Sequence, residues 1–153
     1  LMVQHEVAKR IVGNGPAFRQ IQRLVKQLGL EKIVVLTGQI PYREMPQYYA
    51  ACDWQVTAST FETQGLGILE GMACGKPCIG AESLAIPETI KNNYNGFLFE
   101  PFNVEQCAAQ MQTALEIRNS KYNVFCRNAA ATGKQHSIQN TVVKWEKLYN
   151  PLL

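Results

Sequence analysis

The sequence of 153 residues lacks any apolar run of about 18 residues, the length that a helix needs to span a membrane. Its opening stretch, residues 1–6, lacks the apolar core of a secretory signal. The formal net charge is only +3, too small an excess to indicate nucleic acid as a partner. With 46% apolar and 18% charged residues, the composition is that of an ordinary globular domain. We therefore expect one cytoplasmic domain that binds no nucleic acid.

Residues that could ligate a metal or form disulfides are also sparse. The two histidines, His5 and His136, lie at opposite ends of the sequence. The cysteines are odd in number, are scattered through apolar segments and have no histidine close to them in sequence; they are Cys52, Cys74, Cys78, Cys107 and Cys126. This pattern is typical of small buried hydrophobic residues in a reducing compartment, and it disfavours a zinc site or a disulfide framework.

What the sequence does contain is an alternation of short apolar runs with amphipathic segments. That alternation predicts a parallel sheet covered by helices, because helical crossovers connect parallel strands. The predicted strands cover residues 10–12, 33–37, 54–58, 77–80 and 96–99. The fold class that we predict is therefore α/β, a doubly wound, Rossmann-like parallel sheet flanked by helices. Sheets of this kind bind ligands at the carboxyl ends of their strands.

Apolar residues at helical spacing predict the helices. The first helix contains Phe18, Ile21, Leu24, Val25 and Leu28, and Gly29 follows as its stop. Another helix is predicted to begin after Asn103, with Gln106 in the position that completes a capping box. Two more helices are predicted over residues 121–131 and 138–148.

Two glutamates, Glu62 and Glu70, bracket a glycine-bearing turn between the predicted strand 54–58 and a helix-like segment, 69–74. A strand-to-helix junction of this kind gathers unpaired backbone N–H groups at the positive end of a helix dipole, which suits an anion. Carboxylates beside it can accept hydrogen bonds from hydroxyl groups. A phosphate attached to a sugar is therefore the ligand class that the segment indicates.

The same segment carries a family resemblance. Its pattern of Glu, seven residues and Glu, followed by Gly-Met-Ala-Cys-Gly-Lys-Pro at 71–77, resembles the donor-binding motif of the retaining, two-lobed (type B) group 1 glycosyltransferases. Stretch 58–66 also resembles the variant found in glycosyltransferases that act on diacylglycerol lipids. Further segments resemble the family in the same order along the chain; they are residues 11–16, 36–41, 45–53, 86–90 and 95–99.

The resemblance implies a function and a role for individual residues. The chain would be the carboxy-terminal domain that binds a nucleotide-diphosphate sugar, commonly UDP-linked, for transfer of a hexose. Glu62 would be the catalytic residue, facing the donor sugar as an electrostatic and orienting group, and Glu70 would bind both ribose hydroxyls. The other donor-binding residues implied are Thr63 and Gln64 at the sugar, Gly65 and Leu66 at the pyrophosphate, and Gly38, Gln39 and Ile40 at the nucleobase. Tight turns for the glycines and a solvated helix position for Glu70 are the structural alternatives.

The sequence also departs from the family pattern. Residues 1–9 offer no counterpart for the Arg and Lys that contact the donor pyrophosphate in related domains, and the acceptor-binding lobe is missing. We therefore expect a domain fragment, inactive alone, whose lipid or saccharide acceptor is bound by the missing lobe. Asp53 is the single aspartate, so no Asp-x-Asp motif exists, and we expect neither a divalent metal nor another cofactor.

Two other functions remain open at this stage. One is a non-catalytic, sugar-nucleotide-binding accessory module, which the missing Arg and Lys favour and the two glutamates disfavour. The other is a sugar-nucleotide epimerase of the same architecture. In addition, the segment Lys-Trp-Glu-Lys-Leu-Tyr at 144–149 has the basic and aromatic character of a helix that contacts anionic lipid. The favoured alternative is that this helix packs back onto the domain and onto the missing lobe, so that peripheral membrane contact of the full-length protein remains an open hypothesis.

Overall fold

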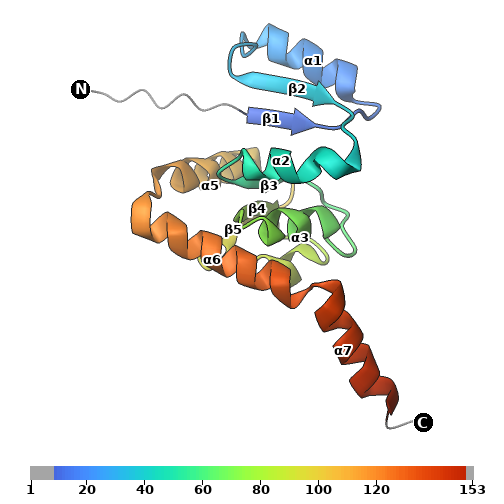
Figure 1. Cartoon of the computed structure of the whole chain (residues 1–153). Coiled ribbons are helices and arrows are strands. Elements are labelled where there is room, and N and C mark those ends of the chain that lie inside the picture. Colours follow the sequence, from blue (N-terminus) through green and yellow to red (C-terminus); the bar gives the residue numbers. More distant parts are fainter. Residues whose placement is uncertain (1–8, 151–153) are drawn as a thin grey trace. The chain divides into compact units, whose positions relative to one another are not determined.

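The computed structural model describes residues 9–150 (Figure 1), and the chain divides between Met45 and Pro46 into two compact units. Each unit is described by itself. The expectations about the opening of the chain concern residues 1–8 almost entirely and lie outside the described residues. Within residues 9–150, no helix has the length and apolar character needed to cross a membrane.

The first unit is a strand–helix–strand arrangement. Strands β1 (Lys9–Val12) and β2 (Val34–Gly38) pair in parallel, with Ile11 opposite Leu36, and helix α1 (Phe18–Gln27) connects them. As predicted, Gly29 follows the end of α1, where its φ of 65° suits a residue without a side chain. A short 3-10 helix, η1 (Tyr42–Glu44), follows β2.

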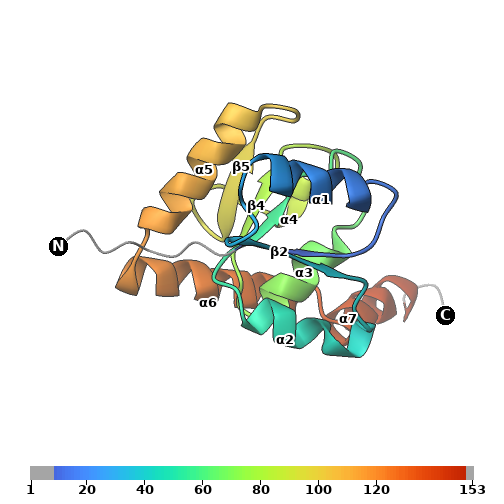
Figure 2. The same cartoon turned by 90° about the horizontal axis from the view of Figure 1, so that it is seen from above.

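The second unit contains a three-stranded parallel sheet in the order β3-β4-β5. Its strands are β3 (Gln55–Thr57), β4 (Cys78–Ala81) and β5 (Gly96–Phe99). The helices are α2 (Met45–Ala50), α3 (Leu66–Ala73), α4 (Ile86–Thr89), α5 (Val104–Glu116), α6 (Asn119–Gln135) and α7 (Ile138–Tyr149). Figures 1 and 2 both show α3 and α6 side by side.

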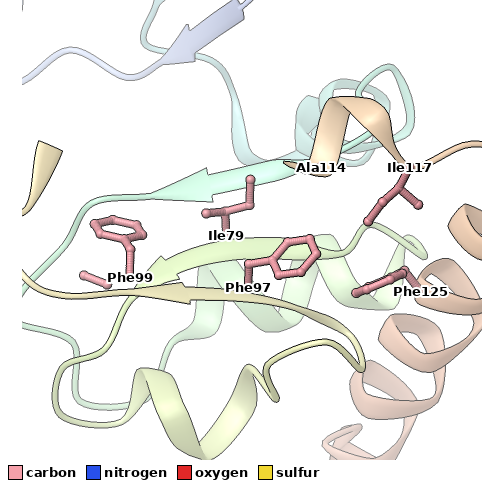
Figure 3. Packing of buried hydrophobic residues seen from close by; sticks show 7 residues of the cluster. Ile79, Phe97, Phe99, Ala114, Ile117 and Phe125 are labelled. Carbon is pink, nitrogen blue, oxygen red and sulfur yellow. The ribbon is translucent and has the colours of Figure 1, made fainter. Parts of the chain in front are cut away.

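Strand β4 is buried along its whole length, because helices cover both faces of the central strand. Successive side chains of a strand point to opposite faces, and so β4 contributes to two hydrophobic clusters. Ile79 packs with Phe97 and Phe125 (Figure 3), and the indole of Trp54 stacks on Phe97 with ring centroids 5.5 Å apart. Cys78 belongs to the other cluster, which contains residues of α3, α4 and α6; they are Ile68, Met72, Ile86, Ile90 and Ala129.

The five strands lie within one residue of the predicted ranges at nearly every end, and the predicted α/β class with parallel strands flanked by helices is confirmed. Among the described residues, β1 pairs with β2 within the first unit, and β3, β4 and β5 pair within the second. An apolar run identifies a strand but not the strand that will pair with it.

Helix α6 crosses α3 at a glycine. A methyl group added to Gly133 would lie 2.5 Å from the backbone nitrogen of Ala73 and 2.6 Å from its Cα. These separations are well below van der Waals contact, and backbone atoms cannot rotate away as a side chain can. The position of α3 on the sheet therefore depends on the absence of a side chain at Gly133.

Replacing Asn103 by alanine is expected to lower the free energy of unfolding by about 1 kcal/mol, because the substitution removes the N-cap of α5. The Asn103 side chain accepts a hydrogen bond of 2.9 Å from the backbone N–H of Gln106, as predicted. The Gln106 side chain accepts from the N–H of Glu100 instead of returning to Asn103, so the capping box is only half formed. Urea denaturation would measure the loss, and Asn103→Asp, which keeps an acceptor, should retain most of the stability.

Candidate functional site

The turn between β3 and α3 adopts a conformation that requires glycine. Gly65, the N-cap of α3, has φ 65° and ψ 34°, in the left-handed region, where an L-residue with a side chain costs about 1–2 kcal/mol. The first helical hydrogen bond runs from the N–H of Leu69 to the carbonyl of Gly65, at 3.0 Å. The amides of Leu66, Gly67 and Ile68 therefore precede the hydrogen-bonded ladder and have no partner within the helix.

The Glu62 carboxylate lies at this positive end of α3. Its Oε1 accepts a hydrogen bond of 3.0 Å from the N–H of Gly65, and the residue is half-buried. The helix dipole favours a negative charge at this position. The structure thus brings together Glu62 and Gly65, which the sequence assigned separately to sugar and phosphate, and it shows that the glycine amide is already hydrogen-bonded to the glutamate.

The backbone of this segment is held by the loop that follows β4. The Ser83 hydroxyl donates to the carbonyl of Thr60 at 2.8 Å, and the N–H of Ala85 donates to the carbonyl of Glu62 at 3.1 Å. Both loops follow the carboxyl ends of neighbouring parallel strands, β3 and β4. The position of Glu62 is therefore fixed by two connections at the edge of the sheet where α/β proteins bind ligands.

Glu70 lies a little more than one turn into α3 and is half-buried. The hydroxyl of Tyr49, on α2, donates a hydrogen bond to its Oε2 at 3.2 Å. Glu70 is therefore held by a half-buried tyrosine of the neighbouring helix and is not a fully solvated position. Tyr49 was missed by the sequence analysis, because nothing in the sequence indicates which tyrosine of α2 faces α3.

The remaining predicted site residues fall into two groups. Thr63, Gln64 and Leu66 are exposed around the turn that precedes α3. Gly38, Gln39 and Ile40 belong to the first unit, at the carboxyl end of β2, where Gly38 has a φ of 70°. The carbonyl of Gly38 accepts a hydrogen bond of 2.9 Å from the N–H of Gly13.

The cysteines do not contribute to this site. Cys78 is buried in the sheet, and its burial raises the pKa of its thiol well above the ordinary value, so that the thiol stays protonated. Cys74, at the carboxyl end of α3, is exposed, so the expectation of a buried cysteine is wrong at this position. Across residues 9–150, His, Cys, Asp and Glu side chains form no cluster of three or more that could hold a metal ion.

Comparison with known protein families gives a match over most of the chain. The model of the family described as Glycosyl transferases group 1 matches residues 3–132. N-acetyl-alpha-D-glucosaminyl L-malate synthase of Bacillus anthracis is 32% identical over 143 residues, which are 94% of this chain and 37% of the synthase. Alpha-monoglucosyldiacylglycerol synthase of Streptococcus pneumoniae is 32% identical over 99 residues, covering 65% of this chain and 22% of that protein.

Solved structures give the same result for the fold. HepE of Anabaena in complex with UDP superimposes with a TM-score of 0.84 and 28% sequence identity, over 96% of this chain and 41% of HepE. Its complex with UDP-glucose gives a TM-score of 0.82. The chain thus spans about two fifths, or less, of the length of these relatives.

Proposed function

The chain belongs to the group 1 glycosyl transferases, and on this premise we propose that its β3–α3 segment binds the nucleotide-diphosphate sugar from which a longer enzyme transfers a hexose. One observation carries the proposal. A single short segment presents a carboxylate at the start of α3, a second carboxylate one turn later, and the unpaired amides of the helix start between them.

Each part of this segment matches one part of such a donor. The amides of Leu66, Gly67 and Ile68, together with the helix dipole, suit the pyrophosphate. The Glu70 carboxylate suits the two ribose hydroxyls, because each of its oxygens can accept a hydrogen bond. The Glu62 carboxylate and the exposed backbone of Thr63 and Gln64 suit the sugar.

This combination suits the chemistry of glycosyl transfer. The bond between the anomeric carbon and the pyrophosphate oxygen breaks, so that negative charge grows on the departing pyrophosphate and positive charge on the sugar ring. Fixed backbone amides stabilise the first charge, and losing one such donor in comparable sites costs about 3–4 kcal/mol. The Glu62 carboxylate stabilises the second charge and orients the sugar. In this proposal the backbone amides and the helix dipole do the work that a divalent metal does elsewhere.

Uridine is the nucleobase that we propose for the donor. This choice is supported by the solved complexes of HepE with UDP and with UDP-glucose. A lipid or saccharide acceptor is proposed for the longer enzyme, with retention of the anomeric configuration. The alpha-monoglucosyldiacylglycerol synthase among the relatives supports a lipid acceptor, and a cytoplasmic location with peripheral membrane contact would bring the enzyme to it.

Calorimetric titration of the chain with UDP, GDP and ADP tests the proposal. We expect saturable, one-to-one binding of UDP, and affinities at least tenfold lower for GDP and ADP, a difference of about 1.4 kcal/mol. Uridine, which lacks phosphates, should bind much more weakly than UDP because it leaves the helix start unused. If none of the nucleoside diphosphates binds, the donor-site proposal is wrong for this chain.

A further inference from the structure

One face of α3 consists of two glycines. Gly67 and Gly71 are four residues apart, and residues at this spacing lie on the same face of a helix. The Gln55 side chain, from β3, lies across this face, and its Nε2 donates a hydrogen bond of 2.9 Å to the carbonyl of Gly67. A methyl group added to Gly71 would come within 1.6 Å of Gln55 Oε1 and 3.2 Å of Tyr49 Cδ1. The two side chains therefore occupy the space that a larger residue at position 71 would fill.

Gln55 is held in this position at a cost. Its Oε1 is buried and has no hydrogen-bond partner among the residues that the structure describes. An unpaired buried oxygen is unfavourable, so a packing requirement must offset it. We attribute this requirement to the close packing of α3 against β3, in which Gln55 fills the space beside the glycine face.

Tyr49 lies on the same glycine face. Its hydroxyl would be 3.8 Å from a methyl group added to Gly67, and it donates to Glu70 Oε2 at 3.2 Å. All of these residues belong to the second unit, so the arrangement is internal to it. The hydrogen bond ties the Glu70 carboxylate, on α3, to the phenolic hydroxyl of Tyr49, on α2.

We propose that Tyr49 is a positioning residue for nucleotide recognition, whose hydroxyl orients the Glu70 carboxylate toward the ribose hydroxyls of the donor. The inference rests on the proposed function of Glu70. The glycine face allows the tyrosine ring to approach, Gln55 fixes the helix, and the phenolic O–H selects one orientation of the carboxylate. A side chain oriented before binding loses less conformational entropy when the ligand arrives, and this strengthens binding.

The experiment compares two nucleotides and two tyrosines. Tyr49→Phe and the control Tyr48→Phe are each titrated calorimetrically with UDP and with 2′,3′-dideoxyuridine diphosphate, which lacks the ribose hydroxyls. Tyr48 precedes Tyr49 on α2, and its hydroxyl makes no hydrogen bond within the described part of the chain. We expect Tyr49→Phe to weaken UDP binding about tenfold, as befits a lost hydrogen bond to a charged group, and to leave the dideoxy nucleotide unaffected. Tyr48→Phe should change neither affinity.

A purely structural role for Tyr49 predicts a different outcome, in which Tyr49→Phe weakens both nucleotides equally and lowers the melting temperature. That result, or an unchanged affinity for UDP, would overturn the inference while leaving the proposed function intact. In a Glu70→Ala background the effect of Tyr49→Phe should shrink to less than about twofold, because the hydroxyl acts through the carboxylate. If the unmodified chain binds no nucleoside diphosphate, the proposed function fails, and this inference fails with it.

Discussion

Replacing Glu70 by alanine is expected to weaken UDP binding by about 30- to 150-fold, which corresponds to about 2–3 kcal/mol. The proposed contact is a carboxylate that accepts hydrogen bonds from two ribose hydroxyls, and a hydrogen bond to a charged group contributes about 1.5–3 kcal/mol. Both hydroxyls would return to water on loss of the carboxylate, so the net effect is smaller than twice that value. Isothermal titration of the variant with UDP measures the change directly.

The matched control for this prediction is Glu116→Ala. Glu116 is an exposed glutamate at the end of α5, so its removal changes the net charge equally without touching the β3–α3 segment. The control should bind UDP as the unmodified chain does. Equal weakening by the two variants would point to an effect unrelated to the site, because at long range the loss of a negative charge favours binding of the anionic UDP. Unchanged binding by Glu70→Ala would remove Glu70 from the site.

The second large effect is expected from Gly133→Ala, which should lower the free energy of unfolding by about 1–2 kcal/mol. The added methyl group meets the backbone of Ala73, on α3, at 2.5–2.6 Å, so the two helices must separate to accept it. Overpacking of this kind costs about 1–3 kcal/mol and sometimes more. The higher helix propensity of alanine returns at most about 1 kcal/mol. Chemical denaturation monitored by tryptophan fluorescence is suited to the measurement, because Trp54 lies in the core of the same unit.

Gly15→Ala is the control for this variant. A methyl group at Gly15 finds nothing within 4 Å, and the residue does not have a positive φ. Its stability should stay within about 0.5 kcal/mol of the unmodified chain or rise slightly, since alanine restricts the unfolded state. A Gly133→Ala protein as stable as this control would contradict the close crossing of α3 and α6.

The elements of this fold were predictable from the sequence because each has a strong local signal. Strand β4, for example, is a short apolar run, and the N-cap of α5 is an asparagine followed at the correct spacing by a glutamine. The sequence does not predict which strands pair, because parallel strands are joined by long crossovers that do not specify the partner strand. Within the described residues, the structure pairs β1 with β2 in the first unit and β3, β4 and β5 in the second.

The candidate site was predictable as a segment but not as a network of contacts. The spacing of Glu62 and Glu70 and the glycine turn between them identified the segment, and the start of α3 lies three residues before the helix-like run that the sequence indicated. The hydrogen bond from Gly65 to Glu62 could not be foreseen, because it depends on a left-handed turn. The contact from Tyr49 to Glu70 joins residues 21 positions apart, and only the tertiary packing brings them together.

The glycine face of α3 determines how freely this segment can vary under directed evolution. A residue larger than glycine at position 71 would displace Gln55 or Tyr49. The backbone at position 65 is left-handed, a conformation that favours glycine. Thr63 and Gln64 are exposed, so a combinatorial library that tests their proposed contact with the donor sugar can explore them with little risk to folding. Positions that tolerate substitution (63 and 64) and positions that do not (65 and 71) thus lie within nine residues of one another. The turn can be varied while the helix that carries Glu70 stays unchanged.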